Sequence, residues 1–110
     1  MVCNVSWKVK FYHGVEKDLA LMPNGIRTRM VRLLEMIELK GPNLGEPHTK
    51  PLSNGIFEVR AKAKEGIGRS LFCYQHGETI IVLYAFVKKT QKTPKKFIDI
   101  ALKRKKELDQ

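Results

Sequence analysis

The chain has 110 residues, of which 43% are hydrophobic, and it carries a formal net charge of +10 at pH 7. This length and composition predict one folded domain, residues 1–110, and argue against a disordered chain or a scaffold that needs a metal or a disulfide to fold. No apolar stretch approaches the roughly 20 residues of a membrane span, and the N-terminus alternates instead of forming the apolar core of a signal peptide. We therefore expect a cytoplasmic protein.

The N-terminal half predicts one strand followed by two helices. Polar and apolar side chains alternate from Ser6 to Tyr12, which is typical of a half-buried strand. Apolar residues at helical spacing then mark a first helix from Val15 to Met22 and a second, stronger one from Ile26 to Ile37. A Pro-Asn-Gly sequence separates the two helices, and a Gly-Pro pair ends the second. We expect them to form a helical hairpin that packs one apolar side against a sheet.

The C-terminal half predicts three strands and a last helix, after a loop over residues 43–50. The strands are marked by alternation or by nearly continuous apolar runs, and they span Ile56–Lys62, Ile67–Gln75 and Thr79–Val87. Thr93 is predicted to cap the last helix with Pro94 at its first position, because the hydroxyl accepts a free N–H and proline lacks one.

The order β–α–α–β–β–β–α predicts an α+β domain. The three later strands are expected to form an antiparallel meander, and the first strand joins its edge. The helical hairpin covers one face of this sheet, and a short helix ends the chain. We expect the other face of the sheet to be free, so the charges that it carries become informative.

Positive charge is concentrated near the C-terminus. Residues 88–110 contain nine Lys/Arg against three Asp/Glu, which is +6 of the total charge of +10. Lys95 and Lys96 fall in the first turn of the predicted helix, with Lys92 just before it. Cations there oppose the helix dipole at a cost of about 0.3–1 kcal/mol each, and a bound phosphate would reverse that effect. The pattern favours a polyanionic partner, with an ordinary solvated surface as the alternative.

Three further cations, Arg60, Lys62 and Arg69, lie on two strands that are joined by a Lys-Glu-Gly turn. Arg69 interrupts an otherwise apolar row, and charged residues seldom lie within a sheet face unless they are paired or functional. Arg69 is either a groove arginine that binds a phosphate or one half of an ion pair with Glu58 or Glu78.

Other kinds of chemistry find little support in the sequence. His13, His48 and His76 lie on different elements and are expected to be ordinary surface residues. Cys73 is expected to be a small core residue. No spacing of His, Cys, Asp or Glu is typical of a metal site, and there is no glycine-rich phosphate loop. We therefore expect neither a metal nor a cofactor.

Two segments, IFEVRAKAKEGIGRSLFCYQ at residues 56–75 and AFVKKTQKTPKK at residues 85–96, resemble the RelE/HigB family of type II toxin–antitoxin systems, in its phage-associated HigB-like branch. The resemblance extends from Lys50 to Arg104. It implies the RelE fold, in which helices pack on an antiparallel sheet with a basic concave face. It also implies a bacterial or prophage toxin that enters the ribosomal A site and cuts messenger RNA, with a small helix–turn–helix antitoxin as its partner.

The resemblance also implies roles for individual residues. By position, the family's E-x-R motif ends at Arg60, its G-x-x-R motif ends at Arg69, and its basic motif after the last strand contains Lys88 and Lys89. Relatives often have His where Tyr84 stands, which leaves the proton-transferring side chain open. The implied catalytic residues are Arg60, Arg69, Tyr84, Lys88 and Lys89. The residues expected to bind the RNA backbone are Lys62, Lys92, Lys95 and Lys96.

The implied activity is that of a metal-independent endoribonuclease. A 2′-hydroxyl would attack its adjacent phosphate while cations stabilise the phosphorane. Lys88 or Lys89 is the candidate base, and Tyr84 stacks on a nucleobase, donates a proton or belongs to the core. Two alternatives use the same surface: a ParE-like inhibitor of DNA gyrase and a non-catalytic nucleic-acid-binding module.

Overall fold

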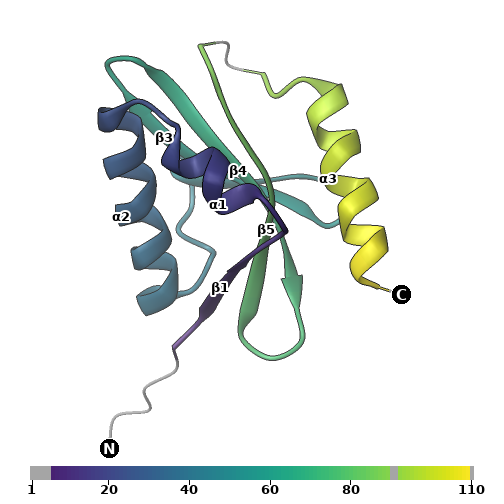
Figure 1. The fold of residues 1–110 in the computed structure, drawn as a ribbon. Coiled ribbons are helices and arrows are strands. Elements are labelled where there is room, and N and C mark those ends of the chain that lie inside the picture. The colour runs from purple at the N-terminus through teal and green to yellow at the C-terminus, as the bar shows by residue number, and fades with distance from the viewer. Residues whose placement is uncertain (1–5, 90–91, 110) are drawn as a thin grey trace, which may run out of the picture.

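The computed structural model describes residues 6–89 and 92–109 (Figure 1). Its elements are, in chain order, β1 (Lys8–Phe11), α1 (Val15–Ala20), α2 (Asn24–Lys40), β2 (Thr49–Ser53), β3 (Ile56–Ala63), β4 (Gly66–Gln75), β5 (Thr79–Lys88) and α3 (Lys95–Leu108). Each strand and helix predicted from the sequence is found near its predicted bounds. None of the helices in the described residues combines the length and the apolar character that a membrane crossing requires.

The five strands form one sheet in the order β1-β5-β4-β3-β2. β1 pairs with β5 in parallel, and the other pairs are antiparallel. The predicted α+β class, the meander and the edge position of the first strand are therefore confirmed. The expected loop over residues 43–50 is wrong at its end, because β2 begins at Thr49 and adds a fifth strand beside β3. Pro51 is tolerated in β2 because this strand lies at the edge of the sheet.

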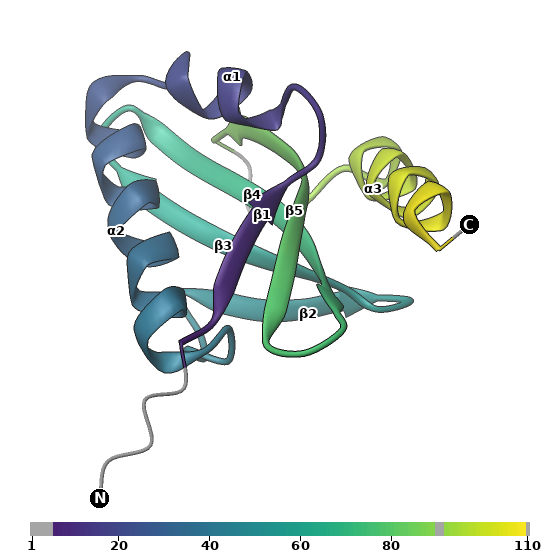
Figure 2. The ribbon, with the colours of Figure 1, turned by 60° about the horizontal axis from the view of Figure 1, so that its bottom comes forward.

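Helices α1 and α2 cover one face of the sheet, as predicted (Figure 2). Buried side chains of α2, among them Ile26 and Met30, pack against Val59 and Phe72 of the sheet in one apolar core. Gly68 allows α2 to come this close to β4, since a Cβ atom at this position would lie 2.3 Å from Cγ2 of Ile26. This layer fixes β3, β4 and β5 from behind and leaves their other side chains to the opposite face.

Helix α3 packs on that opposite face, which is therefore not free as the sequence analysis expected (Figure 2). A second apolar cluster, which includes Leu71, Leu83 and Ala101, joins the sheet to α3. The helix begins at Lys95, with Pro94 at the cap position and no capping hydrogen bond from a side chain. The predicted cap at Thr93 is thus wrong, and the hydroxyl of Thr93 has other partners.

Arg104 anchors α3 to the sheet. Its guanidinium carbon lies 4.5 Å from the ring centroid of Tyr12 and 5.5 Å from that of Tyr84. Its Nη1 donates a hydrogen bond to the carbonyl oxygen of Leu83 at 2.7 Å. The Tyr12 hydroxyl also donates to Glu107 of α3 at 2.5 Å, and this hydrogen bond raises the pKa of the phenol. The anchor fixes where α3 lies relative to β1 and β5.

Replacing Arg104 with Ala should lower the free energy of unfolding by about 1–3 kcal/mol, because it removes two ring contacts and one charged hydrogen bond. Chemical denaturation followed by circular dichroism measures this loss. Lys103→Ala, at the neighbouring exposed position of the same helix, is the matched control and should change stability by less than about 0.5 kcal/mol. Equal effects of the two substitutions would contradict the anchoring role.

Candidate functional site

Cross-strand pairing brings most of the predicted site residues onto one face. Directly opposed residues of antiparallel strands point to the same side of a sheet. Three such rows cross β3, β4 and β5, and they are Glu58–Leu71–Tyr84, Arg60–Arg69–Phe86 and Lys62–Ile67–Lys88. We call this side of the sheet, together with Lys96 of α3, the basic face. The predicted site residues that share it are Arg60, Lys62, Arg69, Tyr84, Lys88 and Lys96.

A β-bulge in β5 sets the orientation of Tyr84. The register between β4 and β5 shifts after the Leu71–Tyr84 pair, because the next residue, Phe72, pairs with Val82 and leaves Leu83 as the extra residue. Leu83 is buried under α3, and Tyr84 points to the same side because it is opposite Leu71. Strict alternation would have placed one of these two neighbours on the other face. Tyr84 is therefore a half-buried residue of the basic face.

Three aromatic rings form a platform beside the cations. The ring centroid of Tyr84 lies 5.7 Å from that of Phe86 and 5.1 Å from that of Phe97, and the centroids of Phe86 and Phe97 lie 4.4 Å apart. All three side chains are half-buried. The ammonium nitrogens of Lys88 and Lys96 lie 5.8 and 5.2 Å from the centroid of Phe97. Aromatic surface next to cations suits single-stranded nucleic acid, because bases stack on the rings while the cations meet the phosphates.

A buried polar network lies beneath this surface, and Glu58 is at its centre with a fully buried side chain. Its Oε1 lies 2.9 Å from Nε of Arg60, and its Oε2 accepts a hydrogen bond from the Thr93 hydroxyl. The Thr93 oxygen accepts in turn from Nη1 of Arg69 at 3.0 Å. Thr93 thus connects β3 and β4 to the segment that leads into α3, and this is the role that replaces the predicted helix cap.

Arg69 is itself fully buried, so it does not present its guanidinium to a phosphate as expected. Burial lowers the pKa of this guanidinium, and the charge of Glu58 opposes the shift. Of the two interpretations left open by the sequence, this geometry favours the one with Glu58, which Arg69 reaches through the Thr93 hydroxyl, whereas Glu78 lies in an exposed turn. Two arginines share one buried carboxylate, and the network therefore keeps a net positive charge under the basic face.

Lys89 is the predicted catalytic residue that the structure places elsewhere. It follows the end of β5 and is exposed. A Cβ atom added to Gly66 would lie 3.5 Å from Cγ1 of Val87 and 3.7 Å from Cγ of Lys89, on the side that faces α2. The alternation that puts Lys88 on the basic face directs its neighbour to the opposite side.

The remaining predicted lysines lie along the margin of α3. Lys92 lines a small hollow with Lys50 and Thr93, between β2 and the segment before α3. Lys95 is exposed and forms an ion pair with Asp99, one turn further along the helix, at 3.2 Å. Lys92 therefore adjoins the buried network, whereas the charge of Lys95 is partly balanced within α3.

The structure also shows where the other reactive side chains lie. Cys73 is buried as expected, and burial raises the pKa of its thiol. His13 and His76 are exposed, whereas His48 lines a hollow that sequence analysis did not anticipate. Within residues 6–89 and 92–109, no three His, Cys, Asp or Glu side chains are grouped closely enough to hold a metal ion.

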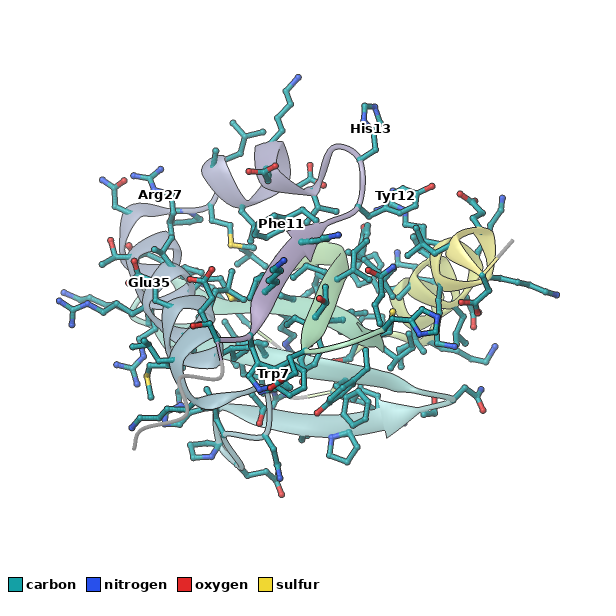
Figure 3. All side chains as sticks on the ribbon, turned by 90° about the horizontal axis from the view of Figure 1, so that it is seen from below. Trp7, Phe11, Tyr12, His13, Arg27 and Glu35 are labelled. Carbon is teal, nitrogen blue, oxygen red and sulfur yellow. The ribbon has the colours of Figure 1, made fainter. Side chains whose placement is uncertain are left out.

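An apolar groove of about 410 Å³ lies between β1 and α2, away from the basic face (Figure 3). Phe11 and Val31 are among its apolar lining residues, and Glu35 and Arg27 also line it. Its lining also includes two further carboxylates, those of Glu16 and Glu38, so it would repel a polyanion. None of the predicted site residues lines it.

Replacing Glu58 with Gln should lower the free energy of unfolding by about 3–5 kcal/mol, because it leaves buried guanidinium charge uncompensated. Equilibrium denaturation measures the loss. Glu78→Gln, in an exposed turn, is the matched control and should change stability by less than about 0.5 kcal/mol. Adding Arg69→Met to Glu58→Gln should recover part of the loss, since one unpaired charge is removed. A Glu58→Gln protein as stable as the control would rule out the network as described.

Comparison with solved structures identifies the fold. An arginine-to-alanine mutant of the Escherichia coli toxin RelE in the free state aligns with a TM-score of 0.64 at 10% identity, over 90% of this chain and 97% of that one. RelE-type chains in the Mycobacterium tuberculosis RelBE2 and Pyrococcus horikoshii RelE–RelB complexes give TM-scores of 0.57 and 0.56 at 20% and 16% identity. These alignments cover 76% and 79% of this chain and 100% and 99% of those chains.

Comparison of sequences gives the family. Among curated proteins, none matches this sequence. A family model does match it over residues 17–106, and that family is described as phage-derived Gp49-like proteins, DUF891. The match spans most of α1, all of α2, the strands from β2 to β5 and most of α3. The chain therefore belongs to the phage-derived Gp49-like family and has the fold of RelE toxins.

Proposed function

We propose that this protein is the toxin of a type II toxin–antitoxin system and cleaves messenger RNA on the ribosome. Membership of a phage-derived family and a fold shared with RelE support this proposal. The observation that carries it is that Arg60, Lys62 and Lys88 point to the same side of the sheet as an aromatic platform, with Lys88 and Lys96 next to the Phe97 ring. Such a surface can hold a strand of RNA by both its bases and its phosphates.

The proposed reaction needs no metal. The 2′-hydroxyl loses its proton and its oxygen forms a bond to the adjacent phosphorus. The bond from phosphorus to the 5′-oxygen then breaks, and that oxygen takes up a proton. The products are a 2′,3′-cyclic phosphate and a 5′-hydroxyl. The protein must align the attack, move two protons and stabilise the extra negative charge on the phosphorane.

The geometry suggests how the residues divide this task. Arg60 and Lys88 stabilise the phosphorane, and Lys62 and Lys96 hold neighbouring phosphates. Proton transfer is assigned to Lys88 and Tyr84, because Tyr84 belongs to the platform and Lys88 lies beside it on the basic face. Lys89 takes no part in the proposed reaction, because it lies on the side of the sheet that faces α2.

Arg69 is assigned a positioning role in place of the catalytic role expected from the sequence. It is fully buried and acts through Thr93 on Glu58, which in turn orients Arg60. In this arrangement Arg69 determines where the guanidinium of Arg60 lies without touching RNA. A residue of this kind affects activity through the geometry of its neighbours.

The ribosome and an antitoxin are the proposed partners. Platform and cations lie on a partly open surface, so we infer that the ribosome supplies the other wall and holds the messenger in the geometry for attack. Two of the structures that share this fold are complexes of a toxin with its antitoxin, RelBE2 and RelE–RelB. By analogy we propose a helix–turn–helix antitoxin as the stable partner of this protein in the bacterial cytoplasm.

Replacing Lys88 with Gln should reduce messenger cleavage by about 100-fold or more, because it removes a cation from the reacting phosphate and a candidate for proton transfer. Primer extension on an abundant messenger after brief expression in bacteria measures the cleavage. Lys103→Gln, on the exposed side of α3, makes the same charge change and should leave cleavage unchanged.

The wild-type result separates this proposal from its rivals. Uncut messenger together with a DNA-damage response would point to gyrase inhibition, and uncut messenger without that response would leave a nucleic-acid-binding module. If Lys88→Gln and Lys103→Gln reduce cleavage equally, the assignment of the site is refuted, but the proposed nuclease activity still stands.

A further inference from the structure

A pocket lined by basic side chains lies at the sheet edge, next to the basic face. Its basic lining residues come from three parts of the fold: Arg29 from α2, His48 from the segment before β2, and Arg60 and Lys62 from β3. Pro47 and Ile67 complete the lining, and the volume is about 240 Å³. We call it the edge pocket. The sequence pattern offers no reason to select Arg29, and His48 was expected to be an ordinary surface residue.

The register of the sheet explains why these side chains meet. Pairing between β2 and β3 begins with Thr49 opposite Val59, and the amide of Arg60 donates to the carbonyl oxygen of His48 at 2.8 Å. Beyond Arg60, β3 is therefore the edge of the sheet. Arg29 reaches this edge from α2 on one side, and Lys62 reaches it from the basic face on the other.

The lining of the edge pocket carries more positive than negative charge. Among the described residues, its lining contains no carboxylate, and with His48 neutral its formal charge is +3. Glu58 does not line the pocket, but it pairs with Nε of Arg60 from the buried side and compensates that charge, so the excess positive charge is carried by Arg29 and Lys62. Like charges held close together repel one another, and a bound anion relieves that repulsion.

The size and chemistry of the pocket indicate the class of ligand. A volume of about 240 Å³ is the share of about eight water molecules, which is enough for one phosphodiester group with part of its ribose. It is smaller than the roughly 300–1,000 Å³ typical of sites for whole drug-sized molecules. One guanidinium group can donate hydrogen bonds to two oxygens of the same phosphate, and the ammonium of Lys62 adds a further donor.

We propose that the edge pocket binds a backbone phosphate of single-stranded RNA, on the strand that continues from the basic face. The proposal rests on the proposed function, because it takes RNA as the polyanion. Arg60 and Lys62 belong to both the edge pocket and the basic face. An RNA strand can thus leave the aromatic platform, cross the edge of β3 and reach α2 without losing contact with cations.

The test uses a fluorescent 12-nucleotide RNA carrying 2′-O-methyl groups, which cannot react by attack of a 2′-hydroxyl, and measures binding by anisotropy over a series of salt concentrations. Arg29→Gln should raise the Kd about tenfold and reduce the dependence of log K on log salt by about 0.7, the value for one phosphate contact with a single strand. Arg32→Gln, at another exposed position of α2 outside the pocket lining, is the matched control and should change the Kd less than twofold.

Arg29→Lys separates a phosphate seat from general attraction. It keeps the charge but loses the two-pronged guanidinium, so its affinity should lie between those of the wild type and Arg29→Gln. If Arg29→Gln and Arg32→Gln weaken binding equally, or if Arg29→Gln leaves the salt dependence unchanged, the edge pocket is not an RNA subsite.

A competition with inorganic pyrophosphate distinguishes an RNA phosphate from a small free anion. If pyrophosphate displaces the RNA at the same concentration of phosphate groups, and if this displacement is lost in Arg29→Gln, the assignment to RNA is overturned. The outcome is separable from that of the proposed function. If RNA binding depends on Arg29 but messenger in cells stays uncut, the subsite is upheld and the nuclease is rejected. If messenger is cut but RNA binding does not depend on Arg29, the nuclease is upheld and the subsite is rejected.

Discussion

The buried carboxylate of Glu58 is the constraint on which the basic face depends. It meets Arg60 directly and Arg69 through the hydroxyl of Thr93, and so it joins β3, β4 and the start of α3 in one network. Burying a carboxylate is costly unless its partners satisfy it, and removing one partner costs about 3–5 kcal/mol. An exposed pair such as Lys95–Asp99 contributes about 0.3–0.5 kcal/mol by comparison. The position of the first turn of α3, with Lys96 and Phe97, therefore follows from a core interaction.

The two faces of the sheet carry different kinds of side chains. The α1–α2 layer supplies an apolar core that holds β3, β4 and β5 rigid. The other face carries the polar network, the aromatic platform and the cations, with α3 fixed beside them through Arg104. A cluster of like charges is unfavourable in itself, and a rigid sheet keeps the cations close while a polyanion is absent. For the proposed function, this arrangement would pre-organise the face to bind a strand of RNA.

Periodicity predicted the fold well, because alternation and helical spacing report directly which side of each element is buried. Strand β2 was missed since Thr49–Ser53 is an edge strand without clear apolar alternation. The site was predicted in part. The resemblance, and not strand parity, put Arg60 and Lys88 in one predicted site, and the register of the sheet places both on one face. An alternating pattern shows which face a side chain points to but not how deeply it is buried, so the burial of Arg69 was not foreseen. The roles of Thr93 and Arg104 depend on contacts between distant elements, for which a local pattern gives no signal.

In the proposed reaction, clustered cations of one sheet face direct a 2′-hydroxyl onto its neighbouring phosphate. The most direct measurement is the chemistry of the cut ends when purified protein acts on ribosomes programmed with a defined messenger. The account predicts 5′-hydroxyl and 2′,3′-cyclic phosphate ends, and no cleavage when the nucleotide at the cut position carries a 2′-deoxyribose. Ends with a 5′-phosphate, or undiminished cleavage of the 2′-deoxy messenger, would contradict it.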